Sequence, residues 1–546
     1  MSGWPRSHWT RAAIVAVFLS VLHTWPLATA PGTLSRNDNG DAMLNEWIVA
    51  WVQHQLPRHP FELFQANIFY PAADSLAFSE PLIVPAILGA PVRLAGGSPV
   101  LVNNLLLLAG MTLSMLAMYA LIREWTGDEV AALVAGAAFA FNTHTLMRLA
   151  HLQAMHAYGM PLALLAADRL LTKPRLSEAG WLALWLSAMA YTSGYFFVFA
   201  FFLVLIAIVV RAPVWMRIPR QVVPRLALAT GLTALAVLPL SIPYRRVAIE
   251  QHMVRSLDNV AEYSAPLRSY LASAGKLHEW LWSLRRFEAP LETFFPGFTV
   301  LLLAICAFAF LRRDGRAPIA MLIAIALTGV VMSLGTRTPV YAWIYHVFPP
   351  LTGIRAAERF GLLFLFGMAG LAGFGVWQVR QRLSPRRAAL AGGIAVLLVT
   401  AEAFAGPMTY RRFDGVPRLY DLLAKEPAGV VLVEQPFYPP EAVFENAEYV
   451  LNSTAHWRPL MNGYSGYIPR TYRDFTRTFW FFPRPHAIEA MQGAGVTHVM
   501  VHPSRFGHEA DRIIALCDAE PRLQKMAVGR YGLTLYRLVP ATPVPR

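Results

Sequence analysis

Apolar runs recur along the whole chain, and short polar segments separate them. A helix that crosses a membrane needs about 20 mostly apolar residues. The lengths and spacing of the runs predict a polytopic α-helical membrane protein with about eleven spans. We place these spans at 11–30, 99–121, 128–142, 154–171, 180–192, 194–211, 222–243, 297–311, 318–335, 357–378 and 387–406.

The local sequence decides how three apolar segments are interpreted. The first run follows two arginines as a secretory signal does, but Pro31 comes after the cleavage point and many spans follow, so we predict an uncleaved helix. Residues 81–96 are short and contain three prolines, which would leave carbonyls unpaired in lipid, so we predict a juxtamembrane helix. Residues 180–211 are predicted to cross twice, with a turn near Ser193 and Gly194.

The composition indicates that lipid is the solvent for most of the chain. Of 546 residues, 56% are hydrophobic and 15% are charged, which is more apolar surface than a water-soluble protein buries. The 47 basic residues exceed the 33 acidic ones, but they cluster between apolar runs, so we expect no nucleic-acid partner. Cys306 and Cys517 lie far apart, which indicates neither a disulfide framework nor a zinc site.

The placement of arginine and lysine predicts the orientation of the spans. By the positive-inside rule, the N-terminus and the basic segments between spans are cytoplasmic. Their basic residues are Arg6, Arg11, Arg123, Lys173, Arg175, Arg211, Arg217, Arg220, Arg225, Arg312, Arg313, Arg316, Arg380, Arg382, Arg386 and Arg387. The outer face then receives residues 31–98, 143–153, 244–296, 336–356 and everything after 407.

Three acidic residues stand close together in the first outer loop. The stretch RNDNGDAMLNEW contains Asp38, Asp41 and Glu46. Residues 41–56 carry apolar side chains at helical spacing, which predicts an amphipathic helix lying on the membrane. These side chains are Leu44, Trp47, Ile48 and Trp51. Asp41 begins this helix, where a carboxylate either caps the free amides or has a chemical role.

Further ionisable residues lie at span ends on the same face. His144, Arg148 and His151 share one face at helical spacing. The later outer segments add Glu292, Arg355, Glu358 and Arg359. Such a group beside apolar helices predicts a shared pocket at the membrane surface. Each residue also has a purely structural interpretation. The histidines can lie at the membrane interface, the arginines can reach lipid headgroups, and Glu358 can pair with Arg355 as a helical neighbour.

Several stretches resemble the GT-C fold of polyprenyl-phosphate-sugar-dependent glycosyltransferases. The first span, GDAMLNEW, FYP at 69–71 and the proline-rich juxtamembrane helix resemble the start of these enzymes. Residues 148–166, 334–361 and 456–469 resemble bacterial membrane proteins assigned to the same superfamily. The resemblance implies a protein of the bacterial inner membrane, a periplasmic active site and a catalytic aspartate in the first loop. That aspartate corresponds to Asp41 or, as a second candidate, Asp38.

The chemistry of such a transfer assigns roles to these residues. A sugar on a lipid phosphate is already activated, so the enzyme needs a base for the acceptor hydroxyl and cations for the departing phosphate. We assign Asp41 as the base, and an inverting displacement by the acceptor oxygen follows if no enzyme nucleophile intervenes. The phosphate candidates are Arg148, Arg355 and Arg359, and the polar helpers are His151 and Glu292.

The resemblance also indicates partners and leaves the metal open. The donor is a polyprenyl-phosphate-linked sugar in the bilayer, and the acceptor is a glycolipid, a polysaccharide or a protein. Residues 38–41 read Asp-Asn-Gly-Asp, which is not the Asp-Asp, Asp-Glu or Asp-X-Asp pair that would indicate a metal. A divalent ion held by Asp38 and Asp41 therefore stays an open question.

The composition changes after residue 406. Residues 1–406 form the predicted transmembrane module, and 407–546 are predicted to form a small soluble α/β domain outside the cytoplasm. Its predicted strands are 429–437, 496–503 and 532–540, and its predicted helices are 485–495 and 509–520. Between them lies an aromatic stretch with Trp457, Tyr464 and Tyr467. These rings either stack on the acceptor sugar or anchor a loop at the membrane interface.

Two other classes of protein compete with the glycosyltransferase. A transporter or flippase for a lipid-linked or anionic substrate usually places ionisable groups near the bilayer midplane and often has an internal repeat. Here those groups gather at outer span ends. A noncatalytic assembly protein would use the outer loops as docking surfaces. Neither class predicts that one carboxylate is indispensable.

Overall fold

The computed structural model describes residues 5–36, 40–253, 255–283, 292–309 and 316–540. The chain forms two compact units. The first unit contains residues 1–31, 104–241 and 254–409, and the second contains residues 32–103, 242–253 and 410–546. The first outer loop of the sequence is thus grouped with the C-terminal residues.

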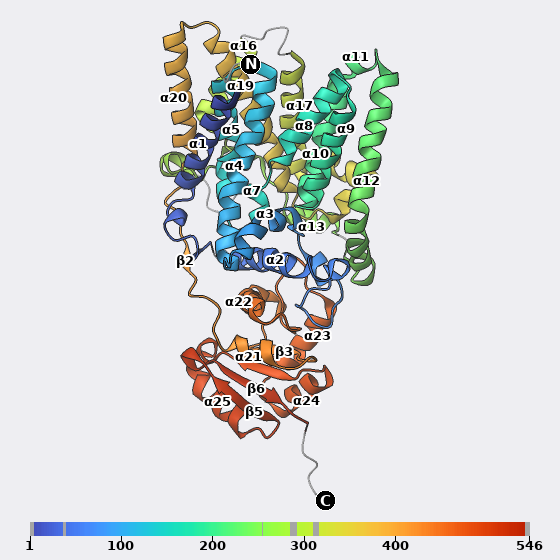
Figure 1. The fold of residues 1–546 in the computed structure, drawn as a ribbon, viewed down its shortest axis with the longest axis vertical. Coiled ribbons are helices and arrows are strands. Elements are labelled where there is room, and N and C mark those ends of the chain that lie inside the picture. Colours follow the sequence, from blue (N-terminus) through green and yellow to red (C-terminus); the bar gives the residue numbers. More distant parts are fainter. Residues whose placement is uncertain (1–4, 37–39, 254, 284–291, 310–315, 541–546) are drawn as a thin grey trace, which may run out of the picture. The chain divides into compact units, whose positions relative to one another are not determined.

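The first unit is a bundle of helices (Figure 1). Its long helices are α1 (Pro5–His23), α4 (Pro99–Thr126), α5 (Glu129–Ala140), α8 (Gly159–Thr172), α9 (Leu176–Ala190), α10 (Gly194–Val210), α12 (Pro219–Glu250), α16 (Phe298–Ala309), α17 (Arg316–Ser333), α19 (Gly361–Arg380) and α20 (Pro385–Ala403). Shorter helices connect them: α6 (Thr143–Leu146), α7 (Leu152–Met155), α11 (Ala212–Trp215), α13 (Leu257–Glu262), α14 (Lys276–His278) and α18 (Pro339–Val347). A helix forms at each of the predicted span positions, and α9 and α10 are separated by the turn expected near Ser193.

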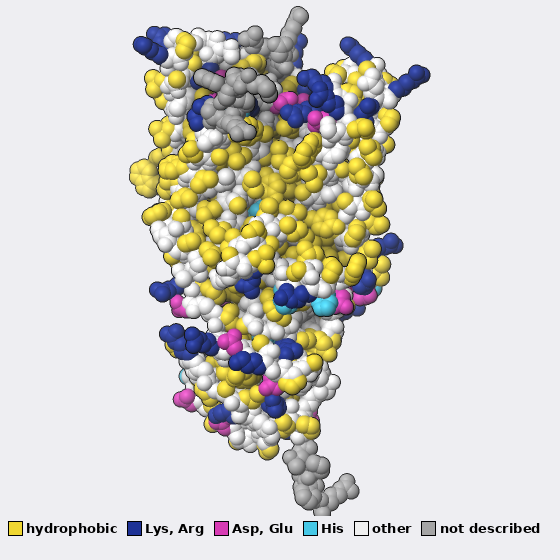
Figure 2. Space-filling view, viewed as in Figure 1, with side chains coloured by type: hydrophobic (Ala, Val, Ile, Leu, Met, Phe, Trp, Pro, Cys, Tyr) yellow, Lys and Arg dark blue, Asp and Glu magenta, His cyan; other side chains and the backbone are white. Residues whose placement is uncertain are grey.

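By length and composition, four helical segments are suited to crossing a membrane: Pro99–Thr126, Pro219–Glu250, Arg316–Ser333 and Ala357–Arg380. Figure 2 shows hydrophobic side chains over most of the visible surface of the helical unit. Several apolar side chains of this unit are more than half exposed, among them Ile14, Leu235 and Leu302. Exposed apolar side chains in such numbers are typical of helices that face lipid. The structure therefore supports a membrane protein, and the count of about eleven spans stays a prediction.

Glycines let the helix α19 lie at the centre of the first unit. A Cβ atom on Gly375 would lie 1.8 Å from the carbonyl oxygen of Leu303, and one on Gly367 would lie 2.4 Å from that of Leu322. The backbones of α16 and α17 therefore approach α19 more closely than larger residues permit. Small residues at such contacts are the usual means of packing helices in lipid.

Ion pairs join the helices at segments predicted to face the cytoplasm. Arg11 pairs with Glu129 at 2.7 Å and links α1 to α5. Arg211, at the end of α10, pairs with Asp168 of α8 at 2.6 Å. Arg380 of α19 pairs at 3.0 Å with Asp128, whose carboxylate also caps α5. The basic residues that predicted the topology are therefore also contacts between helices.

The second unit contains helices and two small sheets. Its helices are α2 (Asp41–Gln55), α3 (Ile83–Leu94), α21 (Tyr420–Lys425), α22 (Ala447–Asn452), α23 (Arg470–Phe479), α24 (Pro485–Gly493) and α25 (Ala510–Ala519). Its strands are β1 (Leu34–Ser35), β2 (Arg411–Arg412), β3 (Leu432–Gln435), β4 (His498–Val501), β5 (Leu523–Val528) and β6 (Thr534–Leu538). The strands β1 and β2 pair antiparallel, and the larger sheet has the order β3-β4-β6-β5 with β3 and β4 parallel.

The three predicted strands of this sheet are present, whereas β5 was missed. Buried strands without alternation are easily recognised from apolar runs, and β3 and β4 are buried at every position. The edge strand β5 reads LQKMAV and is mostly exposed, so its pattern is weak. The predicted helices 485–495 and 509–520 correspond to α24 and α25.

Candidate active site

A glycine fixes where the helix α2 begins. Gly40 is its N-cap residue and has a φ of 84°, a left-handed conformation that favours glycine. A Cβ atom there would lie 2.7 Å from the Cβ of Ala447, so a side chain is excluded as well. Asp41 is therefore the first helical residue, which agrees with the predicted start of this helix at residue 41. Its carboxylate still lies at the positive end of the helix dipole.

Tyr464 contacts the carboxylate of Asp41 directly. Its hydroxyl donates a hydrogen bond of 2.6 Å to Asp41 Oδ1, across 423 residues of sequence. Both side chains are half-buried, so the carboxylate is partly accessible while one oxygen is held. Sequence reasoning chose Tyr464 as an acceptor-stacking residue, and the structure places it as the partner of Asp41.

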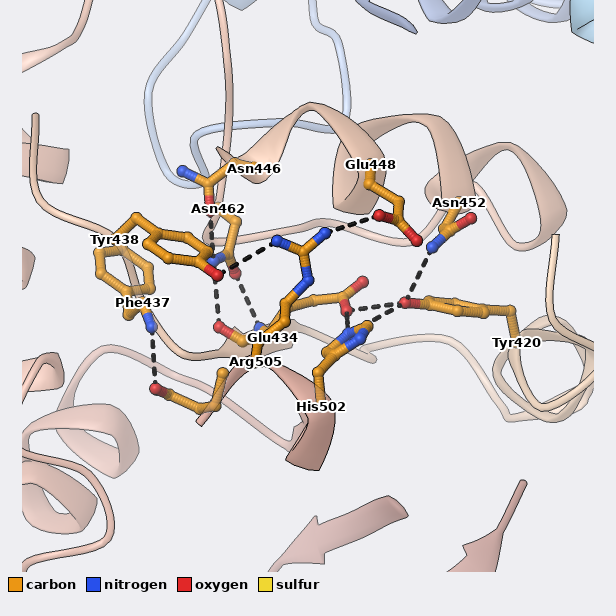
Figure 3. A network of polar contacts seen from close by, with 11 residues as sticks. Tyr420, Glu434, Phe437, Tyr438, Asn446, Glu448, Asn452, Asn462, His502 and Arg505 are labelled. Atoms are coloured by element: carbon orange, nitrogen blue, oxygen red, sulfur yellow. Dashed lines mark hydrogen bonds and ion pairs between the residues drawn. The ribbon is translucent and has the colours of Figure 1, made fainter. Parts of the chain in front are cut away.

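A buried polar network holds the segment that carries Tyr464 (Figure 3). Asn462 accepts a hydrogen bond of 2.7 Å from the backbone N–H of Glu434 on β3 and donates one of 3.1 Å to the carbonyl of the same residue. Asn446 donates to the carbonyl of Gly463 at 3.1 Å. Glu434 in turn accepts from the hydroxyl of Tyr420 at 2.7 Å. These hydrogen bonds fix the backbone at Asn462 and Gly463, immediately before Tyr464. The ring of Tyr464 is thereby oriented toward Asp41.

The other two aromatic candidates have different contacts. Trp457 stacks on His54, with 4.4 Å between the ring centroids, so part of its ring is already covered. The hydroxyl of Tyr467 donates to the carbonyl of Gln251 at 2.9 Å. Neither contact joins these rings to Asp41, and their acceptor role stays a prediction.

The described part of the chain contains no group of three or more His, Cys, Asp or Glu side chains placed to hold a metal ion. The second acid candidate, Asp38, lies outside the described residues. The observed partner of Asp41, a tyrosine hydroxyl, is a hydrogen-bond donor.

The helix α2 is more deeply buried than a helix on a membrane surface. Its apolar side chains are buried as expected, but Asn45 and Glu46 are buried too, because α2 packs against both α3 and α22. Ser35 donates a hydrogen bond of 2.6 Å to Glu46 Oε1. Burial raises the pKa of Glu46 to about 8, although the Ser35 contact opposes the shift. Glu46 is therefore protonated at neutral pH and differs chemically from the half-buried Asp41.

A second cluster of charges lies in the first unit. His144 Nδ1 is 2.8 Å from Glu292 Oε2, and the guanidinium of Arg148 pairs with the other oxygen of the same carboxylate. Burial on its own would raise the pKa of Glu292, but Arg148 and His144 hold that pKa below its usual value. Glu292 thus carries its charge at neutral pH and balances a buried arginine.

Residues of this cluster line a small cavity of about 30 Å³, which has room for water. The lining includes His144, Arg148, His151, Tyr195 and Arg359. The Arg359 guanidinium lies 4.5 Å from the centre of the Tyr195 ring, a distance typical of cation–π contacts. Burial lowers the pKa of His151 to about 3, with Arg359 adding to the shift, so this imidazole is neutral at neutral pH. Of the ionisable residues in the predicted pocket, Glu292, Arg355 and Glu358 are not in the lining of this cavity.

Two local predictions for this cluster were wrong. Residues 143–153 do not form one helix, because α6 ends at Leu146 and α7 begins at Leu152; the bend between them, rather than helical spacing, brings His151 to the cavity. Glu358 does not pair with Arg355 as a helical neighbour. Its carboxylate lies 3.8 Å from Arg148, and Arg355 instead stacks over the ring of Tyr263 at 4.5 Å.

Sequence reasoning missed Tyr195. Its hydroxyl accepts a hydrogen bond of 3.0 Å from the backbone N–H of Ala356, and its ring supports Arg359. Tyr195 lies in an apolar run immediately after the turn at Ser193 and Gly194. The sequence does hold one signal for a functional role of Tyr195, because it is a polar aromatic residue at the start of a predicted span.

No family model matches the sequence, and a search of curated proteins finds no match. Among solved structures, the arabinofuranosyltransferase AftD from Mycobacteria is similar, with a TM-score of 0.63, 14% identity, and coverage of 99% of this chain and 40% of that chain. ArnT from Cupriavidus metallidurans, bound to undecaprenyl phosphate, is similar with a TM-score of 0.50, 13% identity and coverage of 98% of both chains. This chain spans about two fifths of the length of AftD. The resemblance to the GT-C fold is confirmed.

The protonated state of Glu46 makes stability depend on pH. The folded state keeps its proton up to a pKa of about 8, whereas the unfolded chain releases it near the ordinary value. Between these values the folded state binds more protons, so stability falls as pH rises, by about 1.4 kcal/mol per pH unit. We expect Glu46→Gln to remove this contribution. Thermal unfolding of the purified protein at pH 5 and pH 8 measures it; an equal change with pH in parent and variant would contradict the assignment.

The pairing of Glu292 with Arg148 predicts a large effect on stability. Glu292→Gln leaves a buried guanidinium without its main counter-charge, which costs about 3–5 kcal/mol. The matched control is Glu279→Gln, whose exposed partner Lys276 is 3.3 Å away and whose loss costs below about 1 kcal/mol. Thermal unfolding in detergent compares the two variants. Equal melting temperatures would show that the cluster does not hold the first unit together.

Proposed function

We propose that this protein is an integral membrane glycosyltransferase that moves a sugar from a polyprenyl-phosphate donor to an acceptor outside the cytoplasm. The observation that carries the proposal is the half-buried Asp41 carboxylate, held by Tyr464 at 2.6 Å in a chain with the GT-C fold. Two further observations support the proposal: the apolar helices suit a lipid-linked donor, and the similar structure of AftD is named as that of an arabinofuranosyltransferase.

Asp41 is the proposed base for the acceptor hydroxyl. The hydrogen bond from Tyr464 holds one oxygen of this carboxylate and orients it. The base takes the proton as the acceptor oxygen attacks the anomeric carbon and the bond from that carbon to the phosphate oxygen breaks. One displacement without an enzyme nucleophile inverts the anomeric configuration. A buried acid that keeps its proton at neutral pH, as Glu46 does, is unsuited to this role.

Arg148 and Arg359 are the proposed contacts for the departing phosphate. Both line one cavity, and guanidinium groups offer paired donors to phosphate oxygens and keep their charge throughout. The ArnT structure is described as bound to undecaprenyl phosphate, and we propose a ligand of the same class for this chain. Arg355 is a weaker candidate because it is not in the lining of this cavity.

The proposed location is the bacterial inner membrane, with the N-terminus in the cytoplasm and residues 407–546 in the periplasm. It rests on the placement of basic residues and places Asp41 on the periplasmic side. A transporter is the alternative function. The two functions predict different results for substitution of Asp41, because transport does not require a base there.

The base assignment predicts a loss of activity without a loss of fold. Asp41→Asn keeps the size of the side chain but removes the proton acceptor, so transfer should fall by about 10²-fold to 10⁴-fold. Tyr464→Phe removes only the orienting hydrogen bond, and its loss should be on the order of tenfold. The assay is glycosyl transfer from a polyprenyl-phosphate sugar by purified protein. The matched control is Asp474→Asn, whose carboxylate is 68% exposed; full activity of Asp41→Asn would return Asp41 to a structural role.

The phosphate assignment predicts different effects for substitutions of Arg359 and Arg355. Arg359→Gln removes a cavity-lining guanidinium, so the KM for the donor should rise on the order of tenfold, the weight of one charge-assisted contact. Arg355→Gln should change the KM little, because Arg355 is not in the lining of the cavity. Donor titrations of the two variants in the transfer assay compare them. An effect of Arg355→Gln as large as that of Arg359→Gln would contradict the proposed phosphate site.

A further inference from the structure

The second unit contains a cavity of about 670 Å³ that the proposed mechanism does not use. This volume lies within the range of roughly 300–1,000 Å³ that ligand sites occupy. Its wall includes Ser35 and Met43 from the first loop and residues 411–419 and 529–531 from the C-terminal part of the chain. Met43 lies in the first turn of α2, so the cavity lies beside the helix that begins with Asp41.

The charge of the cavity wall is predominantly positive. Arg411, Arg412, Arg418 and Arg530 line it, against the two acids Asp414 and Glu448. Both acids have cationic partners: Asp414 pairs with Arg412 at 3.0 Å, and Glu448 pairs with Arg505 at 2.6 Å. Within the described residues, Arg411, Arg418 and Arg530 form no ion pair. The cavity therefore offers cationic donors to an anionic ligand.

Pairing of β1 with β2 places two of these arginines. Leu34 lies opposite Arg412, and Ser35 lies opposite Arg411. The hydroxyl of Ser35 is in turn bound to Glu46 of α2. The arginines therefore stand on backbone that is joined to the proposed catalytic helix, rather than on a free surface loop.

An exposed tyrosine in an unusual backbone conformation completes the wall. Tyr531 has a φ of 58° and Gly532 has a φ of 74°, at the turn of the hairpin between β5 and β6. Positive φ at both central positions is the type I′ pattern, for which Asn-Gly is the preferred pair. A bulky aromatic residue is disfavoured there, yet the Tyr531 side chain is 74% exposed. The guanidinium of Arg530 lies 4.6 Å from the ring centre, which leaves the opposite ring face open.

We propose that this cavity binds an anionic segment of the acceptor glycan. The open face of Tyr531 is a platform for a sugar ring, and the arginines match carboxylate or phosphate groups on the sugar. Met43 lines the cavity, and Asp41 is two residues away from it on α2, so the two side chains do not face the same side of the helix. The cavity is therefore a binding subsite at a distance from the acceptor hydroxyl that reacts. The proposal deepens the proposed function and rests on it for the identity of the acceptor.

A carbohydrate fits this site better than a lipid headgroup. The site pairs its arginines with an exposed aromatic ring in a disfavoured backbone conformation, and a sugar ring can stack on such a ring. Such outliers are often retained for a function. Binding to vesicles of anionic lipid is the outcome that would favour the lipid.

The test is equilibrium binding to the full-length protein in detergent. The probes are an oligogalacturonate, a phosphorylated oligosaccharide and a neutral galactan of matched length. We expect both anionic probes to bind more tightly than the neutral galactan and to weaken as salt screens the arginines. The preferred anion identifies the group on the natural acceptor. Equal binding of anionic and neutral probes would overturn the proposal.

Three variants locate the binding. Arg418→Gln and Arg530→Gln should each weaken the anionic probe by about tenfold. Tyr531→Asn introduces the residue that the turn prefers, so it should keep or raise the melting temperature and still weaken binding several-fold. A purely structural Tyr531 would leave binding unchanged in this variant. The matched control, Arg477→Gln, removes an arginine that is 81% exposed and lies outside the cavity wall; an equal loss there would show nonspecific charge attraction.

Failure of this proposal can be told apart from failure of the proposed function. Asp41→Asn should bind the anionic probe as the parent does, because Asp41 is not part of the cavity wall. If transfer occurs but the arginine variants bind and transfer normally, the glycosyltransferase survives and the anionic subsite does not. If the anionic probe binds through these residues and no sugar is transferred, the binding site survives without the enzyme.

Discussion

The hydrogen bond between Tyr464 and Asp41 is the contact on which the proposed chemistry depends. It connects residues 423 positions apart, and it forms only because both ends are fixed. Gly40 lets α2 begin at Asp41 without a collision, and Asn462 ties the segment before Tyr464 to β3. The carboxylate that results is half-buried and oriented, in contrast to Glu46 one turn later, which burial keeps protonated.

Sequence patterns were sufficient for the long helices and for three of the four strands in the larger sheet. Long apolar runs, such as those that form α4 and α19, have few other solutions in lipid because every backbone group must be paired within the helix. The proline-rich segment at 81–96 was predicted to be a separate helix, and α3 is present there. The resemblance carried by GDAMLNEW and the neighbouring stretches identified the fold correctly. Weak alternation in the exposed strand β5 explains why that strand was missed.

The contacts of the candidate site were less predictable, because they join segments that are remote in sequence. No local pattern indicates that Tyr464 meets Asp41 or that Tyr195 supports Arg359. Helical spacing suggested that His144 and His151 share one face of a helix. The chain instead bends between them, and the bend brings both side chains to the same cavity. Local spacing likewise suggested the Glu358–Arg355 pair, whereas Glu358 lies near Arg148 in space. Contacts between distant segments, rather than local spacing, therefore determine the arrangement of these residues.

The stereochemistry of the product tests the central claim most directly. A base-assisted attack by the acceptor oxygen on a polyprenyl-phosphate sugar is a single displacement, so the anomeric configuration must invert. The measurement is nuclear magnetic resonance of the glycoside formed by the purified protein from a donor of defined configuration, with the release of polyprenyl phosphate followed in the same reaction. The account predicts inversion, with one lipid phosphate released for each sugar transferred. Retention of configuration, or transfer without release of the lipid phosphate, would contradict it.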